Sequence, residues 1–122
     1  MSATPSFIIG MIEPDGVIEA GRLSDMLRVS RAELALASGL SRDAVSKTAR
    51  LRTPSTQSRL RDVVQILQRV LPWCGSLPQA FAWYRAQPLP SFGDQTAEAL
   101  VKDGQAEAVK RYLDRIAVGG YA

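Results

Sequence analysis

The sequence predicts an all-α protein, and two kinds of signal carry this prediction. Apolar residues recur at spacings of three and four, most clearly from Leu60 to Leu71, which is the period of a helix with one buried face. Serines stand just before several such segments, where a hydroxyl can accept a free backbone N–H of the first helical turn. Glycine or proline follows them, so both ends of these helices are encoded locally.

Two short helices joined by a tight turn are predicted over residues 31–50, RAELALASGLSRDAVSKTAR, and the chain is organised around them. Ser30 can cap the first helix, Arg31–Ser38, and Glu33 stands at the capping-box position. Gly39 follows, the residue best suited to the left-handed conformation that ends a helix.

The second helix of this pair begins after another serine. Ser41 can cap a helix that runs from Arg42 to about Arg50. The apolar contact between the two helices would consist of Leu34, Ala35, Leu40, Ala44 and Val45. The outward face is short, basic and polar, as in a helix that enters a DNA groove. We expect DNA contacts from Ser41, Arg42, Asp43, Ser46, Lys47 and Arg50, and from Arg52 in the loop that follows.

This pattern resembles the helix-turn-helix of the Xre/phage-repressor family over about residues 27–51. The resemblance is carried by small Ala35, by Gly39, and by apolar Leu40 and Val45. The sequence departs from the family at Thr48, where a larger apolar or aromatic residue is usual. The resemblance implies an Xre-like bundle that binds operator DNA and represses transcription. An ordinary helical hairpin uses the same caps and glycine and is the structural alternative.

Charge is concentrated around the helix pair. Residues 1–19 carry a net charge of −3, residues 20–75 carry +6 from ten basic and four acidic residues, and residues 76–122 are neutral. A basic segment of this kind is suited to a phosphate backbone, where it releases condensed counterions.

The segments that flank the pair complete a first domain, residues 17–72. Residues 1–16 are expected to form a partly ordered lead, whose apolar patch Phe7–Ile12 is either a short strand or an arm on a neighbour. Val17–Arg28 is predicted to be helical despite Gly21 in its interior. Ser55 can cap the longest helix, Thr56 to about Leu71, which Pro72 would end. The apolar residues of this helix form one stripe, which we expect to pack in the core and to be a possible dimer interface. The stripe consists of Leu60, Val63, Val64, Leu67, Val70 and Leu71.

A second helical domain is predicted over residues 73–122. Ser76 can cap a helix over Pro78–Ala86, and an irregular loop follows over Gln87–Asp94. Gln95–Lys102 and Gln105–Val118 are predicted to be the last two helices. We expect the aromatic residues Trp73, Phe81, Trp83 and Tyr84 to bury most surface in this domain.

Residues from about Leu60 to Ala122 resemble the C-terminal toxin-binding domain of the Xre/MbcA/ParS antitoxin family. The shared features are Leu71-Pro72-Trp73, Trp83-Tyr84, and a segment that leads from Leu100-Val101 through Gly104 and Val109 to the final Gly119-Gly120-Tyr121-Ala122. Ala97 and Ala99 stand where the family usually has a proline and an acidic residue.

The resemblance implies a type II antitoxin whose partner is a RES-domain toxin, an enzyme that consumes NAD. The antitoxin tail would occupy the toxin active site, with Tyr121 in the slot for a nucleotide base and the Ala122 carboxylate beside an arginine. The implied toxin-binding residues are Tyr112, Arg115, Ile116, Gly119, Gly120, Tyr121 and Ala122. The antitoxin would act as a homodimer within a larger toxin–antitoxin hetero-oligomer and repress its own operon.

The composition argues against an enzyme or a membrane protein. The chain has no histidine, one cysteine, no glycine-rich phosphate loop and no metal-ligand spacing, so we expect no catalytic residue, cofactor or metal. Asp43 and Asp62 are expected to be salt-bridge partners. No apolar run approaches the roughly 20 residues of a membrane span, no signal peptide is recognisable, and Cys74 has no internal partner. We therefore expect a cytoplasmic location, partly on DNA.

Two other functions stay open at this stage. The chain could be a plain Xre-family transcriptional regulator whose C-terminal half binds something other than a toxin. It could also be a scaffold in which the helix-turn-helix serves only dimerisation, and the small Thr48 favours this reading because it packs weakly.

Overall fold

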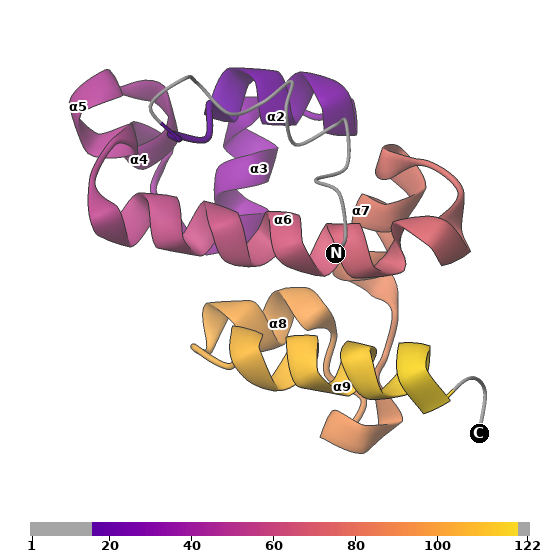
Figure 1. The fold of residues 1–122 in the computed structure, drawn as a ribbon. Helices are drawn as coiled ribbons and strands as arrows, with labels where there is room; N and C mark the ends of the chain where they lie inside the picture. The colour runs from indigo at the N-terminus through magenta and orange to yellow at the C-terminus, as the bar shows by residue number, and fades with distance from the viewer. Residues whose placement is uncertain (1–15, 120–122) are drawn as a thin grey trace. The chain divides into compact units, whose positions relative to one another are not determined.

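The fold is described from a computed structural model, which describes residues 16–119 (Figure 1). This range contains eight α-helices, one short 3-10 helix and no β-strand, so the all-α prediction is confirmed. The chain divides into two compact units, residues 1–61 and 62–122, and the division lies inside the longest helix. In the range that the structure describes, no helix combines the length and apolarity needed to cross a membrane.

The first unit contains four short helices and the start of a long one. In chain order these are α2 (Ala20–Leu27), α3 (Arg31–Ser38), α4 (Arg42–Ser46), α5 (Thr48–Leu51) and the first turns of α6 (Pro54–Cys74). The helix α2 packs against α3 and α4, and α4 packs against both α3 and α5. The larger side chains buried in this unit are Ile18, Leu23, Leu27, Leu34, Val45, Leu51 and Leu60.

The helix α2 begins later than its sequence predicts. A helix was expected from Val17, whereas the structure starts α2 at Ala20. The reason is a tertiary contact, because the backbone of Ile18 exchanges two hydrogen bonds with the side-chain amide of Gln57. These bonds hold residue 18 in place before the helix, so the first turn cannot form there.

The helix α6 is longer at both ends than the predicted Thr56–Leu71. It starts at Pro54, whose fixed φ suits a first helical turn, so Ser55 lies inside the helix and does not cap it. Pro72 also lies inside α6, which continues to Cys74. A proline so close to the end removes one backbone hydrogen bond without stopping the last turn, and Gly75 N–H still donates to the Leu71 carbonyl at 3.0 Å.

The second unit contains the rest of α6, then α7 (Leu77–Ala86), the 3-10 helix η1 (Pro90–Phe92), α8 (Ala97–Lys102) and α9 (Ala106–Gly119). Ser76 caps α7 as predicted. Thr96 caps α8, which begins at Ala97, two residues after the predicted start at Gln95. The predicted loop over Gln87–Asp94 contains η1, and Leu89 and Gln95 form an isolated antiparallel bridge across it.

The aromatic residues of this unit divide into two groups. Phe81 and Tyr84 are buried and stack with ring centroids 5.9 Å apart, as expected of core residues. Trp73 is 45% exposed and Trp83 is half-buried, so the two tryptophans contribute less buried surface than expected. Trp73 lies in the last turn of α6, where its ring is left at the surface.

Candidate functional site

The turn between α3 and α4 has the predicted geometry. Ser30 Oγ accepts the backbone N–H of Glu33 at 3.0 Å and so caps α3. Gly39 adopts a left-handed conformation with φ of 71°, which ends the helix. The N–H of Leu40 then donates to the carbonyl of Ala35 at 2.9 Å and closes the turn. Local sequence therefore fixes the position at which α4 begins.

The second helix of the pair is shorter than predicted. Ser41 Oγ accepts the N–H of Ala44 at 3.1 Å, as expected for its cap. However, α4 ends at Ser46, and Lys47 is extended with φ −100° and ψ 122°. A new helix, α5, starts at Thr48, so the single helix expected from Arg42 to about Arg50 is not formed.

Two local features at Lys47 disfavour a continuous helix. The hydroxyl of Ser46 donates to the Arg42 carbonyl at 2.7 Å, a local bond that competes with regular helix continuation. Thr48 is β-branched and exposed, so it adds neither helix propensity nor core contact. The first large apolar side chain after the break is Leu51, which is 9% exposed and therefore anchors α5 instead.

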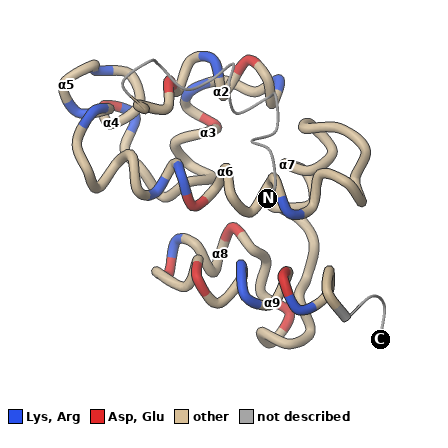
Figure 2. The backbone as a smooth tube through the Cα atoms, viewed as in Figure 1, with Lys and Arg blue, Asp and Glu red and all other residues tan. Residues whose placement is uncertain are grey.

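The predicted DNA-contact residues lie at the surface of the first unit. Asp43 is half-exposed and faces two cations, with its Oδ2 atom 3.9 Å from Lys47 Nζ and 3.8 Å from Arg50 Nη1. This confirms Asp43 as a salt-bridge partner. Basic residues follow one another along α4 and α5 in Figure 2. The exposed members of the predicted set are Ser41, Arg42, Ser46, Lys47, Arg50 and Arg52.

Two of the predicted toxin-binding residues lie together in the second unit. Tyr112 and Ile116 line a mainly apolar groove of about 260 Å³ on the face of α9 that meets the loop before α8. The ring of Tyr112 packs edge-on against Phe92, with centroids 5.5 Å apart. Trp73 and Trp83 line the same groove and are not among the residues that the sequence predicts to bind the toxin. The sequence does contain one signal for this surface. Trp73 lies between Pro72 and Gly75, at the expected end of a helix, where a large side chain is easily left at the surface.

The remaining predicted toxin-binding residues lie at or beyond the end of α9. Arg115 is exposed on the helix. Gly119 is the last residue of α9, one residue after the predicted helix end at Val118. Gly120, Tyr121 and Ala122 lie outside the described residues.

Two charged clusters in the second unit are structural. Lys110 Nζ is buried and donates to Asp62, Gln65 and Glu107 at 2.6–2.8 Å, which uses all three of its protons. Asp62 is thus a salt-bridge partner, as expected. Glu98 receives hydrogen bonds from Arg85 and Lys102, both at 2.8 Å. Burial raises the pKa of Glu98, but these two hydrogen bonds outweigh it and hold the pKa below its usual value.

Residues 16–119 were compared with what a metal site and a reactive thiol require. That range contains no group of three or more His, Cys, Asp or Glu side chains able to hold a metal ion. Burial raises the pKa of the Cys74 thiol, so its reactive thiolate form is disfavoured at neutral pH.

Comparison with protein-family models, with curated proteins and with solved structures finds no match to this chain.

Proposed function

We propose that this chain is a DNA-binding antitoxin in which α3 and α4 act as an Xre-like helix-turn-helix. The DNA-binding part of this proposal rests on one observation, the serine cap of α4 directly after the left-handed turn at Gly39. This cap fixes the start of α4, which exposes Arg42, and the extended Lys47 follows directly after the helix. In helix-turn-helix proteins the N-terminal residues of the second helix contact base edges.

The shortness of α4 favours binding as a dimer. Five residues at about 1.5 Å per residue expose little more than one helical turn to a groove. One good bidentate base contact is worth about 1–3 kcal/mol of discrimination. A single copy therefore reads few base pairs, and two copies on adjacent half-sites double both the contacts and the site length.

The antitoxin half of the proposal rests on the family resemblance and on the groove of the second unit. Trp73, Trp83 and Tyr112 bring three aromatic side chains to that groove. Tryptophan and tyrosine are enriched among the residues that dominate protein–protein affinity. The proposed partner is a RES-domain toxin that consumes NAD, with Tyr121 and Ala122 of the antitoxin entering its active site.

DNA binding is tested by titrating labelled DNA from upstream of the gene with purified protein. Arg42→Ala and Lys47→Ala are each expected to cost about 1–3 kcal/mol if the residue reads a base. Arg111→Ala, an exposed charge of the same sign on α9, is the matched control and is expected to have little effect. Equal affinities for the wild type and for the Arg42 and Lys47 variants would leave the scaffold function as the better account.

Toxin neutralisation is tested in cells that express the neighbouring open reading frame with or without this chain. We expect full-length protein to restore growth and cellular NAD, and a chain ending at Val118 to fold but fail. Restoration by both proteins would keep the antitoxin function and remove the tail from its mechanism. A neighbour that is harmless by itself would favour the plain transcriptional regulator.

A further inference from the structure

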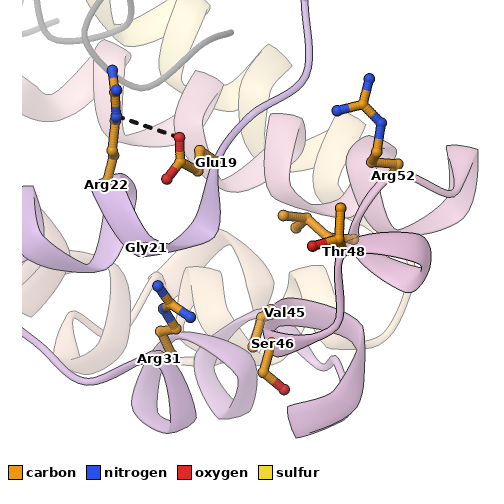
Figure 3. A pocket seen from close by; sticks show the side chains of 9 residues that line it. Glu19, Gly21, Arg22, Arg31, Val45, Ser46, Thr48 and Arg52 are labelled. Carbon is orange, nitrogen blue, oxygen red and sulfur yellow. Dashed lines mark ion pairs between the residues drawn. The ribbon is translucent and has the colours of Figure 1, made fainter.

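A polar cavity of about 460 Å³ lies in the first unit, bounded by α2, α3, α4 and α5 (Figure 3). Three arginine residues line it, Arg22 in α2, Arg31 at the start of α3 and Arg52 after α5. One carboxylate, that of Glu19, also lines it and pairs with Arg22 at 3.3 Å. The formal charges of these four described side chains sum to +2 at neutral pH.

The position of Arg31 depends on Gly21. Figure 3 shows the Arg31 side chain reaching from α3 toward the backbone of α2 at Gly21. A Cβ atom on residue 21 would lie 2.5 Å from Arg31 Nη2, which is too close for any real contact. Glycine inside a helix costs about 1 kcal/mol relative to alanine. The space that Gly21 provides is what allows the guanidinium to lie at the cavity wall.

Arg31 is exposed and has no ion pair with a carboxylate among residues 16–119. Among the described residues, no acidic side chain therefore competes with a ligand for its guanidinium.

The cavity lies beside the break between α4 and α5. Thr48, which begins α5, contributes only a short side chain to the wall. The apolar side chains of Val45 and Leu51 form part of the lining, so the cavity combines an apolar portion with a cationic rim.

We propose that this cavity binds a small phosphate-bearing molecule, such as a sugar phosphate. The planar guanidinium group of arginine binds two phosphate oxygens at once through two parallel N–H groups. The volume is within the range of about 300–1,000 Å³ that small-molecule sites occupy. A single inorganic ion would leave the apolar lining uncovered, whereas a sugar phosphate has carbon atoms to place against it.

Occupancy of the cavity regulates DNA binding, and this second step rests on the proposed function. Ser46 and Thr48 line the cavity and directly flank Lys47, one of the proposed base-reading residues. A ligand that fills the cavity fixes the distance between α4 and α5, and it therefore selects one placement of Lys47. Affinity for operator DNA is expected to change when the ligand binds.

The test is a ¹⁵N–¹H NMR titration of the full chain with ribose 5-phosphate, and with sodium chloride at matched ionic strength. Saturable shifts are expected at the amides of Gly21, Arg31 and Thr48. Loss of a charge-assisted hydrogen bond predicts that Arg31→Gln weakens binding about tenfold or more. Gly21→Ala is expected to do the same, because the new methyl group displaces the guanidinium while alanine favours the helix. Arg111→Gln is the charge-matched control.

The outcomes separate the small-molecule site from its alternatives. Equal shifts with sodium chloride, or unchanged affinity in both variants, would overturn the site. If ribose 5-phosphate does not bind but both variants weaken DNA binding, the cavity holds a backbone phosphate of DNA and the proposal is wrong. If the protein binds no DNA at all, the titration still decides whether the site exists, and only the regulatory step is lost.

Discussion

Gln57 holds Ile18 through two reciprocal hydrogen bonds. The N–H of Ile18 donates to Gln57 Oε1 at 2.7 Å, and Gln57 Nε2 donates to the Ile18 carbonyl at 3.1 Å. The same Nε2 atom donates to the Leu51 carbonyl at 2.8 Å. One buried amide on α6 thus joins the segment before α2 to the end of α5, and all three contacts lie in the first unit.

Replacing this amide is expected to destabilise the first unit. Gln57→Leu leaves three buried backbone groups without a partner, and each such group costs about 1–3 kcal/mol. Some relaxation and water entry are expected, so we predict a loss of about 3 kcal/mol in the free energy of unfolding. The measurement is urea unfolding followed by far-UV circular dichroism, because residues 1–61 contain no tryptophan or tyrosine. Gln68→Leu, a half-buried position on the same helix, is the control and should change stability little.

The buried ammonium group of Lys110 gives a second prediction, in the other unit. Lys110→Met leaves Asp62 and Gln65 without their shared donor. Breaking a fully buried pair costs about 3–5 kcal/mol, and because the Asp62 side chain is 23% exposed we expect about 2 kcal/mol. Tryptophan fluorescence reports this unit, since both tryptophans follow residue 62.

A double variant separates the cost of an unpaired charge from the cost of lost packing. Asp62→Asn combined with Lys110→Met removes both charges, and we expect it to recover part of the lost stability. Lys102→Met, at a more exposed lysine, should cost less than about 1 kcal/mol. A double variant that is less stable than Lys110→Met alone would contradict the charge explanation.

Stability is expected to depend on pH through Glu98. Its pKa is lowered in the folded chain, so the folded state binds this proton less tightly than the unfolded state does. The resulting stabilisation is present above the unfolded pKa of about 4.3, and it is lost as the pH falls through the lower folded pKa. The stability difference between wild type and Glu98→Gln should therefore shrink between pH 6 and pH 3.

The cause of this pKa shift can be checked by removing one partner. Arg85→Gln deletes a hydrogen bond at 2.8 Å and leaves Lys102 as the remaining donor. Fewer hydrogen bonds then stabilise the charged carboxylate against the effect of burial, so the pKa of Glu98 should rise. NMR titration of the Glu98 side-chain carboxyl measures this directly. An unchanged pKa would show that Arg85 does not control it.

Features fixed by neighbouring residues could be predicted from the sequence. The caps at Ser30, Ser41 and Ser76 form as expected, and so does the left-handed turn at Gly39. Each requires only a hydroxyl or a glycine at the right distance from a few backbone groups. Helix starts and ends encoded in this way could therefore be read without knowing the fold.

Features decided by distant contacts could not be predicted. The late start of α2 depends on Gln57, which lies 39 residues after Ile18. The surface position of Trp73 depends on Pro72 failing to end α6, which hydropathy does not reveal. The cavity beside Arg31 depends on a side chain from one helix crossing the backbone of another at Gly21. Thr48 was recognised as unusual, but its consequence, a break at Lys47, was not.

Filling the space beside Thr48 tests whether this residue causes the break. In Thr48→Leu the longer apolar side chain can enter the cavity next to Val45 and Leu51, and leucine also favours helix over threonine by several tenths of a kcal/mol. We expect Lys47 to become helical, so that α4 and α5 join, with a stability gain of about 1 kcal/mol. The Cα chemical shift of Lys47 measures the backbone change.

The matched control is Thr48→Ala, which raises helix propensity without filling the cavity. If cavity filling is the cause, Thr48→Ala leaves Lys47 extended, whereas Thr48→Leu converts it and abolishes binding of ribose 5-phosphate. If both variants convert Lys47, the β-branched side chain is the cause and the cavity is its by-product. If neither does, the hydrogen bond from Ser46 Oγ to the Arg42 carbonyl ends α4, and Ser46→Ala is then expected to extend it.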